Sequence, residues 1–168
     1  AMGLAVDEAG WRAAWDAALA PMLPRQQPGV TVLRDYHAEN IMLLGDGGQG
    51  LIDFQDALLG PRVYDLVALL NDSYQEFDRA FVEARLDEFA EAAGDDDLAR
   101  KELGRQFDLV TVQRKLKDAG RFVFIDRVKG NSSFLKFVEP TIEKARASMQ
   151  RLAPTDPAMG ELLAHGDL

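Results

Sequence analysis

The feature that most limits how this chain can fold is a group of short apolar segments lying between two regions of helical periodicity. Val30–Leu33, Ile41–Leu44 and Leu51–Phe54 are each long enough for a short strand and too short for a helix. The glycine-rich stretch 45–50 joins the last two segments. Because these glycines link two strands and do not open a helix, they predict a hairpin turn and not a phosphate-binding loop.

Helical patterns surround this region. We expect helices at 7–22, 64–71, 77–93, about 98–117 and about 132–152, and a loop or short helix after Pro154. Pro21, Pro24 and Pro28 end the first of them. The acidic run 95–97 could suggest a metal site, but carboxylates at a helix amino terminus cap free N–H groups, and we favour that interpretation. The predicted fold class is α+β, mostly α, with one small β-hairpin.

Composition excludes several classes of protein. The chain has 168 residues, 47% of them hydrophobic, which suits one globular domain over 1–168. It has no cysteine, no apolar run of membrane-spanning length and no export signal, so we expect a cytoplasmic protein. A net charge of −9 argues against nucleic acid as a partner, although Mg²⁺ would still allow a nucleotide. No pattern fixes an oligomeric state.

Polar residues gather at both ends of the predicted hairpin. Arg34 and Asp35 precede Asn40, with four residues between Asp35 and Asn40, and Asp53 follows the apolar pair Leu51-Ile52. Each alone reads as an ordinary turn residue. Together they match kinase chemistry, in which one Asp orients the attacking hydroxyl while an Asn and a second Asp hold Mg²⁺ against the ATP phosphates. The hairpin should bring Asn40 and Asp53 close across its base.

The segments 34–40 and 52–56 resemble the aminoglycoside phosphotransferase and choline kinase superfamily, whose loop reads His-x-Asp-x-His-x-x-Asn; Leu33 replaces the first His. Together with the Gly-Pro-x-x-Tyr-Asp-Leu stretch 60–66 and the segment 113–122, they look more narrowly like kinases of the anomeric hydroxyl of N-acetylmuramate or N-acetylglucosamine in cell-wall recycling. The resemblance covers roughly residues 11–152. It implies the carboxy-terminal lobe of a protein-kinase-like fold, whose hairpin carries the catalytic and metal-binding loops.

The resemblance also implies roles for individual residues. By this resemblance, Asp35 is the catalytic base, Asn40 and Asp53 are the Mg²⁺ ligands, and ATP is the phosphate donor. Asp65 is expected to tie down the backbone of the catalytic loop, with Arg34 and His37 as further supporting residues; His37 as an acid–base catalyst is the less favoured alternative.

Three residues are weaker candidates for the acceptor site. Asp56 either contacts a sugar hydroxyl or shapes its turn, and Gln113 and Arg114 either line the sugar pocket or belong to a solvated basic helix face with Lys115 and Lys117. His165-Gly166-Asp167 repeats His-x-Asp without a downstream Asn, so we regard it as coincidence.

A kinase also needs an amino-terminal lobe with a glycine-rich loop and a lysine over the phosphates. About 33 residues precede the catalytic loop, and they read as helix and proline-rich loop. We therefore expect a part of a longer kinase that is inactive alone and needs this missing lobe as a partner. Two alternatives stay open: an aminoglycoside or choline-type kinase, whose cationic acceptor would suit the acidic chain, and a catalytically silent kinase-like binding domain.

Overall fold

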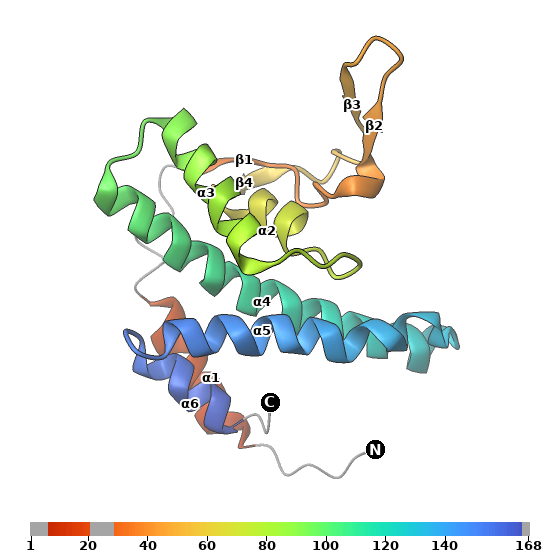
Figure 1. The fold of residues 1–168 in the computed structure, drawn as a ribbon. Coiled ribbons are helices and arrows are strands. Elements are labelled where there is room, and N and C mark those ends of the chain that lie inside the picture. Colours follow the sequence, from red (N-terminus) through yellow and green to blue (C-terminus); the bar gives the residue numbers. More distant parts are fainter. Residues whose placement is uncertain (1–6, 21–28, 166–168) are drawn as a thin grey trace. The chain divides into compact units, whose positions relative to one another are not determined.

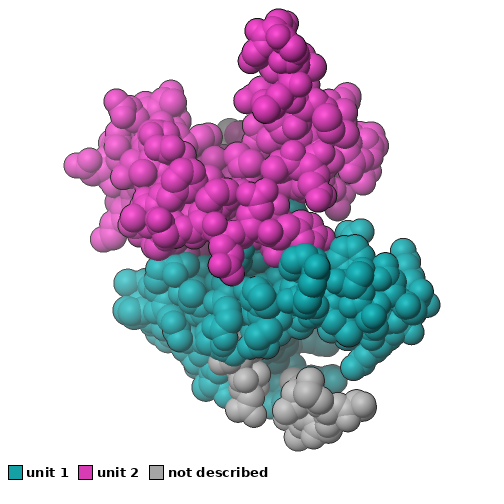
Figure 2. All heavy atoms as spheres, turned by 45° about the vertical axis from the view of Figure 1, so that its right-hand side comes forward, with its two compact units in different colours: residues 1–27, 111–168 teal, residues 28–110 magenta. Residues whose placement is uncertain are grey.

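The computed structural model describes residues 7–20 and 29–165, which form mainly helices together with two antiparallel strand pairs (Figure 1). The chain divides into two compact units, Pro28–Val110 and a second unit that combines Ala1–Gln27 with Thr111–Leu168 (Figure 2). None of the described helices is both long enough and apolar enough to cross a membrane.

The first strand pair of the unit Pro28–Val110 joins β1 (Val30–Val32) to β4 (Leu58–Gly60). Gly60 is needed for this pairing, because a β-carbon there would come within 2.6 Å of Val32 Cγ2. Val32 is stiff at χ1 and fully buried, so it cannot give way. The strand β4 was not predicted: it is only three residues long, and Pro61 follows it directly.

The second strand pair is the predicted hairpin. Its strands β2 (Ile41–Leu43) and β3 (Gln49–Leu51) pair with Ile41 opposite Leu51, and the turn lies between them. The prediction of a strand over Leu51–Phe54 was wrong, because β3 ends at Leu51 and Asp53 has a left-handed backbone with φ 59°. A residue in that conformation cannot continue a strand.

Three helices complete this unit: α2 (Tyr64–Leu70), α3 (Arg79–Ala93) and the first part of α4 (Asp97–Lys129). Asp78 caps α3 by accepting a hydrogen bond from Phe81 N at 2.7 Å, and Gly94 ends it in the left-handed conformation. Asp96 accepts a bond from Ala99 N at 2.8 Å, as the capping interpretation of the acidic run predicted.

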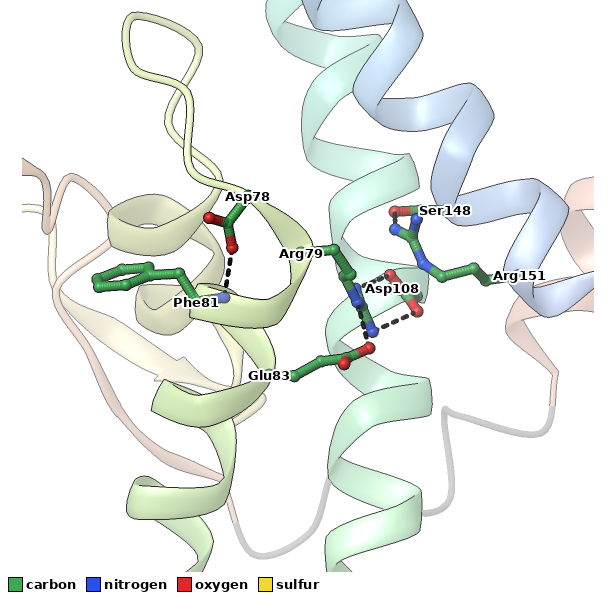
Figure 3. A network of polar contacts seen from close by, with 7 residues as sticks. All are labelled: Asp78, Arg79, Phe81, Glu83, Asp108, Ser148 and Arg151. Carbon is green, nitrogen blue, oxygen red and sulfur yellow. Dashed lines mark hydrogen bonds and ion pairs between the residues drawn. The ribbon is translucent and has the colours of Figure 1, made fainter.

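Arg79 ties α3 to α4. Its Nη1 lies 3.1 Å from Asp108 Oδ1 and its Nε lies 2.8 Å from Glu83 Oε1 (Figure 3). Asp108 is buried, so this ion pair satisfies a carboxylate that would otherwise be costly inside the unit. The buried apolar side chains of the same unit come from β1, α2, α3 and α4 and from Val63, which caps α2; they include Val32, Val63, Val67, Val82, Leu86 and Phe107.

The second unit is entirely helical in its described part. It holds α1 (Glu8–Leu19), the rest of α4, the 3₁₀ helix η3 (Ser132–Phe137), α5 (Val138–Leu152) and α6 (Pro157–His165). Within it α6 packs against both α1 and α5. The Phe122 ring on α4 stacks on Phe134 of η3 with centroids 5.8 Å apart.

Helix boundaries depart from the prediction at two places. The expected helix 132–152 is split into η3 and α5, because Pro140 has no N–H to donate to the carbonyl of Lys136 and is tolerated only in a first turn. The helix expected at about 98–117 continues to Lys129. The predicted end of the first helix, with its prolines, lies outside the described residues.

Candidate active site

The loop that follows β1 is folded tightly by its own backbone. Asp35 N donates to Leu33 O at 2.9 Å, His37 N donates to Asp35 O at 3.0 Å, and Asn40 N donates to His37 O at 2.9 Å. The loop ends in the short 3₁₀ helix η2 (Ala38–Asn40), at the base of the β2–β3 hairpin (Figure 1). Asp35 is therefore held on a backbone whose course is fixed on both sides.

A carboxylate from α2 anchors the start of this loop. Asp65 accepts hydrogen bonds from Leu33 N at 2.7 Å and from Arg34 N at 3.0 Å, one at each oxygen. These are the contacts that the sequence led us to expect for Asp65, although its carboxylate is half-buried and not fully enclosed. Because Asp35 is the next residue, the position of its backbone depends on Asp65.

Two site residues adopt an unfavourable backbone conformation. Arg34 has φ 71° and Asp53 has φ 59°, and they are the non-glycine residues with positive φ in the part of the chain that the structure describes. Each such residue costs roughly 1–3 kcal/mol and persists only where its surroundings enforce it. Both residues flank the hairpin that joins the loops of Asp35 and Asp53.

The hairpin joins the Asn40 and Asp53 loops at its base, as predicted. Ile52 N donates to the backbone carbonyl of Asn40 at 3.1 Å, one step beyond the Ile41–Leu51 pair. The Asn40 side-chain Nδ2 donates to Asp35 O at 2.8 Å. This bond fixes the amide, and no donor among the described residues reaches Asn40 Oδ1, so that oxygen is available as a ligand.

His37 contacts the same amide. Its Nε2 lies 3.4 Å from Asn40 Nδ2, and its Nδ1 is buried with no hydrogen-bond partner among the described residues. A half-buried ring with a buried Nδ1 suits the structural role that we expected for His37, and this role stays a prediction.

The donor atoms at this site suit magnesium. Asn40 Oδ1 and the exposed carboxylate of Asp53 are hard oxygen ligands, which Mg²⁺ prefers. Among residues 7–20 and 29–165, no group of three or more carboxylate, imidazole or thiol side chains could hold a metal alone. Mg²⁺ is usually held by one or two protein oxygens together with water and substrate phosphates, so this sparse set fits a metal that arrives with a nucleotide.

Among the described residues, Asp53 has one side-chain polar contact. The side-chain Nε2 of Gln55 donates to Asp53 Oδ1 at 2.6 Å, and both residues are exposed. We did not assign a role to Gln55 from the sequence. The signal was present, because Gln55 belongs to the segment 52–56 that carried the resemblance, but spacing alone does not reveal which residue its amide contacts.

Asp56 lies near the catalytic loop. One of its carboxylate oxygens is 4.0 Å from Arg34 Nη1, and both side chains are substantially exposed. An exposed pair at this distance contributes little stability. The contact suits the interpretation in which Asp56 shapes its turn, while the alternative of a sugar contact stays open.

The residues expected near the acceptor on α4 differ in exposure. Gln113 is exposed, whereas Arg114 and Lys115 are buried, with 6% and 1% of their surface accessible. The interpretation of this segment as a solvated basic face is therefore wrong for Arg114 and Lys115. Burial lowers the pKa of Lys115 to about 8, even though Asp118 lies 3.4 Å from its Nζ and favours the charged form.

Comparison with known proteins gives a consistent result. Residues 3–103 match the family described as "Phosphotransferase enzyme family". A protein of Neisseria meningitidis serogroup B named "N-acetylmuramate/N-acetylglucosamine kinase" is 37% identical over 165 residues, which cover 94% of this chain and 48% of that protein.

Relatives with the same name occur in two pseudomonads. The Pseudomonas putida protein is 36% identical over 89% of this chain and 43% of its own length, and the Pseudomonas aeruginosa protein is 34% identical over 83% of this chain and 42% of its own length. The chain thus spans less than half the length of these three relatives.

Proposed function

This chain belongs to the phosphotransferase enzyme family, and from that premise we propose that it carries the catalytic and metal-binding loops of an ATP- and Mg²⁺-dependent small-molecule kinase. The observation that carries the proposal is the hairpin joining the loops of Asp35, Asn40 and Asp53. A silent binding domain has no need for oriented oxygens on a strained backbone.

Each residue has a defined task in the proposed reaction. Asp35 accepts the proton of the acceptor hydroxyl as that oxygen bonds to the γ-phosphorus and the bond from phosphorus to the bridging oxygen of ADP breaks. Asn40 Oδ1 and Asp53 hold Mg²⁺, which supplies positive charge to the phosphate oxygens when bound. Asp65 keeps the catalytic loop in place through Leu33 and Arg34. Because phosphoryl transfer needs little covalent help, this positioning supplies most of the catalysis.

The acceptor that we propose is the anomeric hydroxyl of an N-acetylated amino sugar. The support is the name N-acetylmuramate/N-acetylglucosamine kinase that these relatives carry, since they are 34–37% identical over most of this chain. Such a reaction would serve the recycling of cell-wall sugars in the cytoplasm. Asp56, Gln113 and Arg114 remain proposed contributors to the acceptor site.

We also propose that the chain works together with a further lobe that grips ATP. The relatives are about twice as long as this chain. On both strand pairs of the unit Pro28–Val110, large apolar side chains face solvent, among them Leu43 with 84% and Leu59 with 74% of its surface exposed. Apolar strand surfaces of this kind mark a contact site for another segment. The 168 residues alone should turn over poorly or not at all.

An acceptor screen tests the proposed activity. Full-length protein is incubated with Mg²⁺, labelled ATP and either N-acetylglucosamine, N-acetylmuramate, kanamycin or choline, and phosphate transfer is measured. We expect transfer to the two amino sugars. Transfer only to kanamycin or choline would overturn the sugar assignment, and transfer to none with no binding of Mg²⁺–ATP would favour a silent domain.

A further inference from the structure

The hydrogen bond between Gln55 and Asp53 has no part in the fold. Both side chains are exposed, and they lie on the segment after β3, beyond the last pair of the hairpin. The donor Gln55 Nε2 lies 2.6 Å from the acceptor Asp53 Oδ1, and a carboxylate is a stronger acceptor than a neutral oxygen. Ordering two exposed side chains costs conformational entropy, so the contact calls for an explanation other than core packing.

We propose that Gln55 is a positioning residue that orients the carboxylate of Asp53 for Mg²⁺, by holding Oδ1 and leaving Oδ2 directed at the ion. The inference rests on the proposed function and deepens it, because it names the residue that sets the metal affinity of this site. No hydrogen bond from the described residues reaches Asp53 Oδ2, so that oxygen is available for the ion.

The side chain of Asp53 needs such a partner because packing does little to fix it. The side chain is exposed, so packing does not select one rotamer. A carboxylate that binds a metal is commonly held by a hydrogen bond from a neighbour. Gln55 is that neighbour here.

The type of donor matters as well as its position. A glutamine amide orients the carboxylate but carries no charge, so Asp53 keeps the full negative charge that attracts Mg²⁺. A cationic donor would neutralise part of it. The cationic side chain of Arg34 lies 4.0 Å from the next carboxylate in the sequence, that of Asp56. Asp53 and Asp56 thus have different partners, and the uncharged partner, Gln55, contacts the proposed metal ligand.

The test uses the full-length protein with Mg²⁺ and a non-hydrolysable ATP analogue as probes. In the variant Gln55→Met, which keeps the length of the side chain and removes the donor, the affinity for Mg²⁺ should fall roughly 10–100-fold by calorimetric titration. Metal-free binding of the analogue and the melting temperature should not change, because Gln55 is exposed. Gln49→Met, at an exposed position of β3 in the same hairpin, is the matched control and should behave as wild type.

The outcomes separate the inference from the proposed function. Wild-type binding of Mg²⁺ together with an unchanged affinity in Gln55→Met would overturn the role of Gln55 and leave the kinase proposal intact. Tighter binding of Mg²⁺ in Gln55→Met would also overturn it, because the amide would then compete with the metal. If wild-type protein showed no Mg²⁺-dependent binding of the analogue, the proposed function would fail, and the inference with it.

Discussion

The loops around the hairpin and the helical unit use charged and polar residues in opposite ways. Around the hairpin, Asp53 is exposed and Asn40 half-exposed, and their side chains are oriented by one or two hydrogen bonds that leave an oxygen available. In the helical unit, Lys115 has 1% of its surface exposed and lies against Asp118. Charge that is oriented but accessible suits binding and catalysis, whereas charge that is buried and paired serves structure. Substitutions in the two regions should therefore affect different measurements.

The largest effect should follow from Asp35→Ala. If Asp35 accepts the hydroxyl proton, kcat for transfer to an amino sugar in the full-length protein should fall roughly 10²–10⁴-fold. The melting temperature should not fall, because the side chain is half-exposed and the loop is held by its backbone. A kcat within tenfold of wild type would contradict the proposed role of Asp35 as the group that accepts the hydroxyl proton.

Asp65→Ala should lower stability and activity together. It removes the acceptor for Leu33 N and Arg34 N, and each donor left unsatisfied costs roughly 1–3 kcal/mol when buried. Denaturant unfolding and initial rates measure the two losses. Asp65→Asn should recover part of both, since it keeps one oxygen. A loss of stability with normal activity would separate Asp65 from the catalytic loop.

Lys115→Met should alter stability and leave the proposed site unaffected. The pKa of Lys115 is lowered from 10.5 to about 8 by burial, in spite of Asp118 and with the help of Arg114 and Lys144. The unfolded chain therefore binds a proton at Lys115 more tightly than the folded chain does. The free energy of unfolding of the wild type should rise by about 2 kcal/mol between about pH 7.5 and 9.5, because the buried lysine loses its charge over this range.

The variant should lack this rise. Chemical unfolding of both proteins at the two pH values measures the difference, with the exposed Lys117→Met as control. Parallel pH dependence in wild type and Lys115→Met would contradict the buried state of this lysine.

The smallest effect should come from Gly94→Ala, at the end of α3. Gly94 has φ 73°, a conformation that alanine adopts at a cost of about 1 kcal/mol. No atom lies within 4 Å of the added β-carbon, so the cost is conformational and not steric. A thermal melt should show this loss with unchanged activity; a change in activity would mean that fold stability and site chemistry are not separate within this unit.

Much of the fold was readable from local patterns. The hairpin followed from two apolar segments around a glycine-rich turn, and α3 from the helical periodicity of residues 77–93. The features that the sequence did not predict depend on partners that are distant in sequence. The strand β4 exists because it pairs with β1, about 28 residues away in register, and its sequence alone gives no alternation over three residues.

At the site, the sequence predicted candidate residues but not their backbone geometry. Asp35, Asn40 and Asp53 were proposed from their spacing, since kinase chemistry needs these groups, and their roles stay predictions. The left-handed backbones of Arg34 and Asp53 and the amide contact of Gln55 were not predicted, because both depend on how the loops settle against each other. Asp65 was predicted in part. A carboxylate at the start of an apolar helix needs hydrogen-bond donors, and the structure identifies these donors as the backbone N–H groups of Leu33 and Arg34.

The central claim is that Asp53 binds the metal and Asp35 acts on the acceptor. The most direct test titrates Mg²⁺ with a non-hydrolysable ATP analogue into full-length wild type, Asp35→Ala and Asp53→Ala. We expect near-equal affinity for the first two proteins and a loss in Asp53→Ala, because only that variant lacks a charged metal ligand. Equal losses in Asp35→Ala and Asp53→Ala, or no loss in Asp53→Ala, would contradict it.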